Sequence, residues 1–352
     1  MKKRKTRAIN LGGVGIGGGR NPVSVQSMTK TDTRDAAATL RQIRALRKAG
    51  CEIIRIAVPD MDAARALGAI KKSSPLPVIA DIHFDWRLAL EALRQGVDGL
   101  RINPGNIGAS WKLRELVQAL KEREVPVRVG VNAGSLEKKL LEKYGHPCPD
   151  AMVESALNET ELLEKLGFGL IKVSLKASNV PATIEAYRLF ARRTDYPLHI
   201  GISEAGPPEV GTVKSAVGLG ILLSEGIGDT MRVSLTGDPR EEVRVAWQIL
   251  GSLGLRRRGP EIISCPTCGR TSINIQKLAK NAEKILRGLD KPVKVAVMGC
   301  AVNGPGEARE ADFGITGSKG IGILFRKGKV LRTVAEERLL EELMKEIDKW
   351  KP

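Results

Sequence analysis

The chain has 352 residues, more than one average domain and enough for a barrel of about 250 residues with a smaller partner domain. With 42% hydrophobic and 28% charged residues, the composition is that of an ordinary soluble globular protein. The formal net charge of +17 predicts an anionic partner. Three Tyr and five Phe leave little material for stacking on bases, so we expect no nucleic-acid partner.

Nothing in the sequence predicts export or a membrane span. The five cysteines are odd in number and do not form a small-domain disulfide framework. The basic start MKKRKTRAIN leads into a glycine-rich stretch instead of the apolar core of a signal peptide. No run approaches the roughly 18 apolar residues of a membrane-spanning helix. We expect a cytoplasmic protein without a membrane partner.

Short β-branched runs alternate with amphipathic segments from Val23 onward, which predicts an α/β fold. The helical segments include Ala37–Lys48, Trp111–Arg123 and Ser155–Leu166. Eight strands, most of them followed by a helix-length stretch, favour a TIM (β/α)8 barrel, and an open doubly wound sheet is the alternative. The predicted strands are Val23–Met28, Ile53–Val58, Val78–Ile82, Gly99–Asn103, Val127–Asn132, Ile171–Leu175, Leu198–Ile202 and Met231–Leu235.

A smaller α/β domain is predicted after the barrel. Gly, Pro and clustered Arg between residues 251 and 260 are typical of a linker. A helix around Gln276–Arg287, a strand Val293–Met298 and a final helix within Glu336–Trp350 follow it. The predicted division is a barrel over residues 1–250, a linker over 251–260 and a second domain over 261–352.

The segment Gly13-Val-Gly15-Ile-Gly17-Gly18 matches the letters of a dinucleotide-binding fingerprint. That fingerprint needs a strand before it and a helix that opens on it. Here a basic polar segment precedes it, and the next predicted element, beyond Pro22, is another strand. We therefore predict a hairpin or turn that leads into the barrel rather than a nucleotide site.

Five predicted barrel strands carry a basic residue in the middle and a polar or small residue further along the same face. Side chains at i and i+2 share one face of a strand, and the intervening residues, such as Ile54, Val129 and Val173, are apolar. The polar face should therefore point into the lumen, toward the strand ends where barrel active sites lie. The candidate residues are Arg55, Arg101, Asn103, Arg128, Asn132, Lys172, Ser174, Arg232 and Ser234.

Cations buried in a lumen need counter-charges, because an unpaired buried charge costs several kcal/mol. Asp81 and Glu204 offer two carboxylates and leave the lumen positive. A bound anion would restore the balance, and a diphosphate fits both the charge and the planar donors of Arg. Internal salt bridges that close the barrel floor are the alternative.

His83 and Glu204 are the candidates for handling protons in the barrel. His83 lies two residues after Asp81, so it faces the same lumen, where it would contact the substrate or make a structural hydrogen bond. Glu204 lies just past a strand end, a position typical of catalytic residues in barrels, and a carboxylate there can move protons. A surface turn is the alternative for Glu204.

Three cysteines form the strongest motif: Cys265-Pro-Thr-Cys268 and, after 31 intervening residues, Cys300. Structural zinc sites are closed by four ligands, and neither Cys nor His follows Cys300. Glu307, after a Gly-Pro-Gly turn, is the nearest candidate for a fourth ligand. Three thiolates and an exchangeable oxygen favour a [4Fe–4S] cluster, and a zinc ribbon short of one ligand is the alternative. Cys51 and Cys148 are expected to take no part.

Long strings of the chain resemble one family, the 4-hydroxy-3-methylbut-2-enyl diphosphate synthases of the non-mevalonate isoprenoid pathway. The resemblance runs nearly from end to end, and the chain is similar to the short bacterial form because it lacks the extra domain of plant-type members. Ser203 departs from the family pattern, in which Thr is expected directly before the glutamate at position 204. The strings are Cys265-Pro-Thr-Cys-Gly-Arg270, Val297-Met-Gly-Cys-Ala-Val-Asn-Gly-Pro-Gly-Glu-Ala-Arg309, Val25-Gln-Ser-Met-Thr29, Asp81-Ile-His-Phe84, Leu100-Arg-Ile-Asn-Pro-Gly-Asn106, Val131-Asn-Ala-Gly-Ser135, Glu204-Ala-Gly206 and Val233-Ser-Leu-Thr-Gly-Asp-Pro239.

The resemblance implies a TIM barrel followed by a reductase-like α/β domain with a [4Fe–4S] cluster. It implies that Cys265, Cys268, Cys300 and Glu307 hold the cluster and that Asn303 lies nearby. The implied substrate is 2-C-methyl-D-erythritol 2,4-cyclodiphosphate, whose diphosphate would lie among the cations of the lumen. The implied enzyme is an oxidoreductase that opens this ring by a two-electron reduction, with ferredoxin or flavodoxin as electron donor.

The resemblance also implies roles for two glutamates and an assembly. The C3 oxygen of the substrate would replace Glu307 on the unique iron, and Glu204 would protonate the oxygen that leaves as water. Subunits of the family pair head to tail, so a homodimer with a shared active site is expected. The residues alone leave one other class open, a zinc-ribbon protein that binds RNA. A relative of the nitrite or sulfite reductases is a second rival, but those enzymes use an additional haem, and nothing in the sequence predicts a haem pocket.

Overall fold

The computed structural model describes residues 2–351 except 270, 272, 288, 301–305, 307 and 319. The chain divides into two compact units, Met1–Arg256 and Arg257–Pro352, and this boundary lies inside the segment predicted as a linker. The last residue of the first unit is anchored to it. Arg256 donates hydrogen bonds to the Val23 carbonyl and to both carboxylate oxygens of Glu52, and its guanidinium stacks over Trp247.

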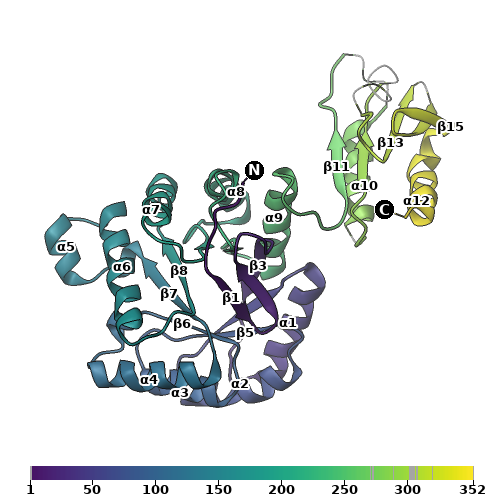
Figure 1. Ribbon diagram of the computed structural model, residues 1–352. Coiled ribbons are helices and arrows are strands. Elements are labelled where there is room, and N and C mark those ends of the chain that lie inside the picture. Colours follow the sequence, from purple (N-terminus) through teal and green to yellow (C-terminus); the bar gives the residue numbers. More distant parts are fainter. Residues whose placement is uncertain are drawn as a thin grey trace. The chain divides into compact units, whose positions relative to one another are not determined.

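Eight parallel strands form the sheet of the first unit (Figure 1), in the order β8-β7-β6-β5-β4-β3-β10-β9. A parallel bridge between Val173 of β8 and Leu198, next to β9, joins the two ends and closes the barrel. The TIM-barrel prediction is thus confirmed, and the open doubly wound sheet is excluded. The strands are β3 (Ser24–Met28), β4 (Ile53–Ala57), β5 (Val78–Asp81), β6 (Gly99–Ile102), β7 (Val127–Asn132), β8 (Ile171–Lys176), β9 (His199–Ile200) and β10 (Thr230–Met231).

Helices cover the outside of this barrel (Figure 1), and the apolar face of the strands packs against them as predicted. Several helices begin at an acidic side chain that accepts a hydrogen bond from their first turn, as Asp35, Asp60 and Asp85 do. The helices are α1 (Ala36–Ala49), α2 (Met61–Ser73), α3 (Trp86–Arg94), α4 (Ser110–Arg123), α5 (Lys138–Tyr144), α6 (Pro149–Lys165), α7 (Val180–Arg193), α8 (Pro208–Ser224) and α9 (Pro239–Ser252), with short 3-10 turns η1 (Pro104–Asn106) and η2 (Ala133–Ser135).

The glycine-rich start is a β-hairpin, as predicted. Strands β1 (Ala8–Leu11) and β2 (Val14–Gly17) pair antiparallel around Gly12 and Gly13, which both have positive φ, the conformation that a two-residue hairpin turn requires. Apolar side chains of the hairpin pack against Ile53 at the start of β4 and Ile79 near the start of β5. The hairpin therefore covers the amino-terminal end of the barrel and leaves the functional end to the loops.

The second unit is a five-stranded sheet in the order β11-β12-β13-β14-β15, in which β11 to β13 are parallel and the last two pairings are antiparallel. Helices α10 and α12 share a core with alternate residues of the sheet, such as Val295 and Val297. Among the described helices of the chain, none is long and apolar enough to cross a membrane. The elements are β11 (Glu261–Ser264), α10 (Ile275–Leu286), β12 (Lys294–Val297), β13 (Phe313–Ser318), β14 (Ile321–Arg326), β15 (Lys329–Ala335), η3 (Glu336–Arg338) and α12 (Leu339–Lys349).

Candidate active site in the barrel lumen and at the cysteine end

A row of charged side chains lies at one level of the barrel lumen. The register pairs Asp81 with Arg101, Arg101 with Arg128, and Arg128 with Lys172, on four neighbouring strands. Residues paired in this way point to the same face of the sheet. The three cations are 4%, 2% and 1% exposed in that order, so they lie inside the barrel as predicted.

Asp81 is the carboxylate around which this row is organised. Its oxygens lie 3.6 Å from Arg55 Nε and 3.5 Å from Arg101 Nη1, and His83 Nε2 is also 3.6 Å away. The His83 ring lies 2.8 Å from Arg101 Nη1, so the i+2 spacing has brought His83 to the lumen. Burial alone would raise the pKa of Asp81, but Arg55, then His83 and Arg101, hold that pKa below its usual range. The carboxylate is therefore ionised at neutral pH.

Several N–H donors of this row have no hydrogen-bond partner among the described residues. Within the described residues, Arg128 Nε and Nη1, Lys172 Nζ and Arg101 Nε have no hydrogen-bond partner. Burial, and then Arg55 and Arg101, lower the pKa of Arg128 well below its usual value. Burial, and then Arg128, lower the pKa of Lys172 to about 7. Internal salt bridges therefore account for only part of the row, and an anion in the lumen would satisfy the rest.

Lys176 belongs to the same face and was missed in the sequence. It is 7% exposed, at the carboxyl end of β8, and pairs in register with Asn132 of β7. Its Nζ lies only 2.8 Å from where a side chain on Gly201 would begin, which places it over the end of β9. Burial, and then Arg128, lower its pKa well below the usual value. The sequence did contain a signal for Lys176, because a residue four positions after Lys172 lies on the same face of the strand.

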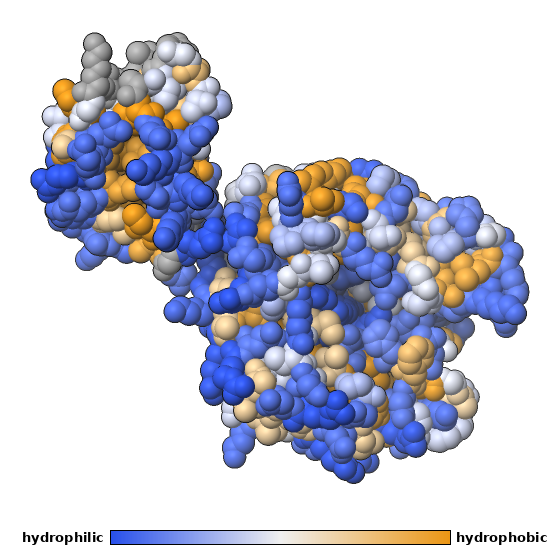
Figure 2. All heavy atoms as spheres, turned by 180° about the vertical axis from the view of Figure 1, so that it is seen from behind, coloured by the Kyte–Doolittle hydropathy of each residue, from blue (hydrophilic) through white to orange (hydrophobic). Residues whose placement is uncertain are grey.

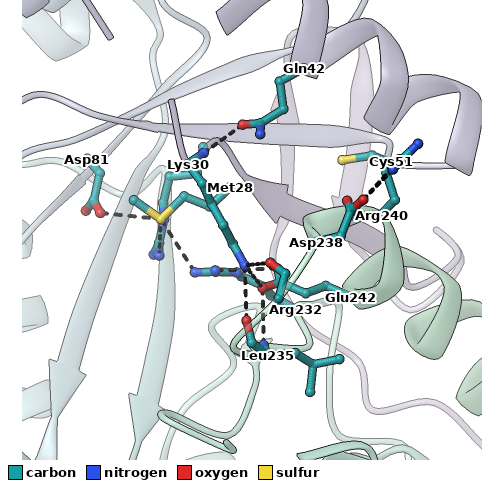
Figure 3. A network of polar contacts seen from close by, with 12 residues as sticks. Met28, Lys30, Gln42, Cys51, Asp81, Arg232, Leu235, Asp238, Arg240 and Glu242 are labelled. Atoms are coloured by element: carbon teal, nitrogen blue, oxygen red, sulfur yellow. Dashed lines mark hydrogen bonds and ion pairs between the residues drawn. The ribbon is translucent and has the colours of Figure 1, made fainter. Parts of the chain in front are cut away.

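Arg232 has a different environment from Arg128, and Figure 3 shows the partners of Arg232. Its Nη2 lies 3.5 Å from Glu242 Oε2 of α9, and its Nη1 is 3.5 Å from the Met28 sulfur. Glu242 is 1% exposed, and its other oxygen lies 3.0 Å from Lys30 Nζ and accepts the Leu235 N–H. Glu242 thus neutralises part of the charge at β10, a role that the sequence did not indicate.

The predicted polar residues of the lumen lie near the carboxyl ends of their strands. Asn103 and Ser174 are buried, and Asn103 Oδ1 has no partner in the described part of the chain. Asn132 and Ser234 are half-buried. They are amide and hydroxyl groups, which bind phosphate oxygens without adding charge.

Glu204 is exposed in the turn that follows β9. Its φ of +51° is in the left-handed region, which costs free energy for a residue other than glycine. Backbone strain of this kind is concentrated at functional sites. This supports the position of Glu204 at the mouth of the barrel, although its role as an acid stays a prediction.

The cysteines lie at the carboxyl ends of two paired parallel strands of the second unit. Cys265 directly follows β11, Cys300 comes three residues after β12, and these strands pair as neighbours. The Gly299 N–H donates to Cys265 Sγ at 3.2 Å, so the two loops touch beside Cys300. Cys268 is exposed, and its N–H donates to Thr271 Oγ1 at 3.0 Å.

The cysteines of the second unit have the chemistry of metal ligands, but the described residues alone do not form a complete metal site. None of the five cysteines forms a disulfide. An N–H donated to sulfur stabilises a thiolate and is typical of iron–sulfur ligands. Among the described residues, no group of three or more Cys, His, Asp or Glu is arranged to hold a metal ion. Glu307 and Asn303, predicted to lie at this centre, fall outside the described residues.

Fold and site together define a TIM-barrel enzyme with a cationic lumen and a cysteine-bearing α/β domain. The sequence matches the GcpE TIM-barrel domain over residues 6–247 and the GcpE protein C-terminal domain over residues 261–349. The chain belongs to the GcpE family.

Curated relatives cover the chain from end to end. A protein of Thermodesulfovibrio yellowstonii is 62% identical over 349 residues, which are 99% of this chain and 100% of that protein. A protein of Geobacter sulfurreducens is 63% identical over 347 residues, 99% of this chain and 98% of that protein. Both are named 4-hydroxy-3-methylbut-2-en-1-yl diphosphate synthase (flavodoxin). The resemblance that the motifs indicated is confirmed.

Solved structures of more distant proteins share the fold. Dihydropteroate synthase of Yersinia pestis superposes with a TM-score of 0.51 at 12% identity, over 70% of this chain and 98% of that one. The enzyme of Stenotrophomonas maltophilia gives 0.51 at 12% identity, over 70% and 99%. At this identity the likeness concerns the fold alone.

Proposed function

We propose that this chain converts 2-C-methyl-D-erythritol 2,4-cyclodiphosphate into 4-hydroxy-3-methylbut-2-enyl diphosphate, with flavodoxin as electron donor. The observation that carries the proposal is the buried row Arg101, Arg128 and Lys172, in a chain whose 62% and 63% identical relatives bear the name of this synthase. Within this row Arg101 Nε, Arg128 Nε and Nη1, and Lys172 Nζ have no partner among the described residues. The diphosphate of the substrate supplies the missing negative charge.

The barrel binds and orients the substrate. Arg101 and Arg128 have unpaired N–H groups, and a guanidinium donates two parallel hydrogen bonds to phosphate oxygens. Lys172 and Lys176 add point charges from β8. Arg55 and Arg101 already share the carboxylate of Asp81, and Arg232 shares that of Glu242, so these three contribute less free charge than Arg128. The neutral groups of Asn103, Asn132, Ser174 and Ser234 complete the site by hydrogen bonding.

Glu204 supplies a proton to the oxygen that leaves the substrate as water. It lies at the end of a barrel strand, where catalytic groups of this fold are found. An exposed carboxyl in a turn can exchange its proton with solvent and carry it to the substrate. His83, which contacts Asp81 and Arg101, is proposed to hold the Asp81 side chain in place and to contact the substrate.

The second unit is proposed to hold a [4Fe–4S] cluster through Cys265, Cys268 and Cys300, with Glu307 as an exchangeable fourth ligand. When bound, such a cluster supplies electrons one at a time and an iron that can take an oxygen ligand. The Gly299 N–H that points at Cys265 Sγ would then tune the thiolate, since hydrogen bonds to sulfur help to set the reduction potential.

We further propose a homodimer with a shared active site, and α8 supports it. The apolar side chains of this helix are not confined to one face, whereas a helix on the outside of a barrel normally keeps a polar face. On its outer side Val210, Val213 and Val217 are 53%, 62% and 50% exposed. In Figure 2 an apolar patch lies along the edge of the barrel unit where Figure 1 shows α8.

The surroundings of this patch favour a second copy of the chain as its partner. Val213 and Val217 line a hollow of about 590 Å³ with residues of α7. Glu185, Arg188 and Lys214 around it carry charges of both signs. A chain with a net charge of +17 repels its own copy on most faces, so self-association needs a face of mixed charge. Sedimentation of the full chain tests this, and a stable, active monomer would contradict it.

Turnover of the cyclic diphosphate by anaerobically purified protein with reduced flavodoxin tests the function. The protein should be brown and contain about four irons per chain. Glu204→Gln should lower turnover by about 100-fold or more, the usual weight of a general acid. Glu115→Gln removes an exposed carboxylate of α4 as a control and should leave turnover unchanged. Colourless protein with one zinc would support the zinc-ribbon alternative, and undiminished turnover would remove Glu204 from the acid role.

A further inference from the structure

Two glutamates with buried carboxylate oxygens lie together beside the loop that follows β6, outside the site described so far. Glu159, in the middle of α6, is 3% exposed, and its Oε2 has no hydrogen-bond partner among the described residues. Glu137, just before α5, also has a buried Oε2 without a partner in that part of the chain. Its Oε1 accepts from Ser155 Oγ at 2.9 Å. Ser155 and Glu159 are one helical turn apart, so α6 presents both to the same place.

Both carboxyl groups face the loop that follows a substrate-binding strand. A methyl group built on Gly105 would lie 3.3 Å from Glu159 Oε1 and 4.0 Å from Glu137 Oε1. The Gly105 N–H acts on the Glu159 carboxylate and works against the rise of its pKa. Gly105 lies in η1, two residues after Asn103 and four after Arg101. Glu159 therefore packs against the segment that connects β6 to α4, at the point where the lumen residues of β6 end, and Glu137 lies next to it.

The protonation state of Glu159 changes the charge that acts on Arg101. Burial, and then the nearby Glu137, raise the pKa of Glu159 to about 8, against the opposing effects of the Gly105 N–H and Arg101. Glu159 is accordingly one of the groups that act electrostatically on Arg101. At neutral pH a protonated Glu159 leaves the charge of Arg101 uncompensated on that side.

We propose that Glu159 is a positioning residue of the diphosphate site. As a neutral carboxyl it fixes the β6–α4 segment and keeps Arg101 available to the substrate, and its ionisation weakens anion binding. This inference rests on the proposed function for the identity of the anion. In the described residues, the charged groups that act on Glu159 are Glu137, in the segment before α5, and Arg101 of β6.

Binding of inorganic pyrophosphate to the full chain, measured by calorimetry across pH, tests the proposal. The quantity to follow is the Kd of the wild type divided by the Kd of Glu159→Gln at each pH, because titrations that both proteins share, such as that of Lys172, cancel in it. The amide keeps the shape and stays neutral. We expect a ratio near one at about pH 6.5 that rises to about tenfold at about pH 9.5.

Two further variants separate this role from a merely structural one. Glu159→Leu loses the polar contact with Gly105 and should bind pyrophosphate more weakly at every pH. Glu137→Gln removes the negative neighbour, so Glu159 should ionise at lower pH and the loss of affinity should begin at lower pH as well. This second variant also tests the proposal if Glu159→Gln does not fold. A ratio that stays constant with pH, or an onset that Glu137→Gln does not move, would overturn it.

Infrared difference spectroscopy provides a readout that does not depend on turnover. A protonated carboxyl absorbs apart from a carboxylate, so the wild type should lose such a band as the pH rises through about 8, the pKa of Glu159. The band should be absent from Glu159→Gln. If the band and the pH-dependent ratio are present but the cyclic diphosphate is not turned over, the proposed function fails while the role of Glu159 stands. If turnover is present and the band is absent, only the role of Glu159 fails.

Discussion

The barrel lumen and the cysteine end of the second unit hold their functional groups in opposite ways. In the lumen, Arg128 and Lys172 are 2% and 1% exposed and lie within strands that are paired with their neighbours. At the cysteine end, Cys265 and Cys300 follow the ends of strands, and Cys268 is exposed in a turn. The sheet itself fixes the first site, whereas loops beyond the sheet carry the second.

This difference indicates which site is formed before its ligand arrives. The cations of the lumen are held close together at a cost in stability, since Arg101, Arg128 and Lys172 are buried without full pairing among the described residues. An anion therefore meets a site that needs little rearrangement. Thiolate ligands commonly reach their final arrangement only with the metal, because metal binding is coupled to local folding. Removing a ligand should thus affect the two regions differently.

The largest expected effect is at the cysteine end. Cys300→Ser should lose the iron and lower turnover by more than about 100-fold, because hydroxyl is a poor substitute for thiolate on iron. Hydrogen exchange should then rise in residues 261–351 and stay unchanged in the barrel. Iron analysis, turnover and exchange mass spectrometry measure these effects.

Cys148→Ser is the matched control for this prediction. Cys148 is half-buried beside α6 in the barrel unit and forms no disulfide. Its replacement should leave iron content and turnover as they are. Full iron content in Cys300→Ser would contradict the assignment of this ligand, and faster exchange throughout the barrel would contradict the contrast between the two regions.

The second largest effect is expected in the lumen, where one substitution should weaken anion binding and raise the stability of the fold. Arg128→Met removes a buried cation whose Nε and Nη1 have no partner among the described residues. Pyrophosphate affinity should fall by about 30- to 100-fold, the value of a charge-assisted hydrogen bond or two. The free energy of unfolding of the ligand-free chain should rise by about 1–2 kcal/mol, because an unpaired buried charge is replaced by a side chain of similar size.

Arg114→Met makes the same change in net charge at an exposed position of α4. It should alter neither affinity nor stability measurably, which separates the local effect from the overall charge. Calorimetry and denaturant unfolding measure the two quantities. A ligand-free Arg128→Met protein that is less stable than the wild type would show that Arg128 is satisfied in the absence of an anion.

The barrel could be predicted from the sequence because the pattern of a short β-branched run followed by an amphipathic segment is local and is repeated along the chain. All eight strands lie within a residue or two of their expected starts, and the lumen face was found from the i, i+2 phase. Strands β9 and β10 have two residues each, shorter than predicted. At Gly201, after β9, both Lys176 Nζ and the Arg232 carbonyl approach within 2.8 Å of a potential side chain, a tertiary contact that no strand pattern contains.

The groups that the sequence missed depend on the partners they meet in space. Glu242 and Glu159 lie on helices, where a glutamate normally faces solvent, and only the packing shows that both are buried. The strands β13, β14 and β15 were also not predicted. Their turns contained a readable signal, since Gly320, Lys327 and Gly328 have the positive φ of hairpin turns.

The smallest expected effect is a proton taken up when the lumen binds its anion. Burial, and then Arg128, lower the pKa of Lys172 to about 7 and that of Lys176 well below its usual value. These lowered pKa values mean that the unfolded chain binds protons that the folded chain does not. The contribution of Lys172 to the free energy of unfolding of the ligand-free chain should therefore fall as the pH drops from about 10.5 to about 7 and then level off, and the difference in unfolding free energy between wild type and Lys172→Met measures it.

A bound diphosphate reverses this pKa shift, because it pairs with the ammonium form. At about pH 9, pyrophosphate binding should take up as much as about one proton, measured by calorimetry in buffers of different ionisation enthalpy. Lys172→Met should remove most of the uptake, since Lys172 lies in register with Arg128 and Arg101. Lys176→Met, four residues nearer the carboxyl end of β8, should remove less. Equal uptake in Lys172→Met and wild type would place the anion nearer to Lys176 than to the row of Arg101, Arg128 and Lys172.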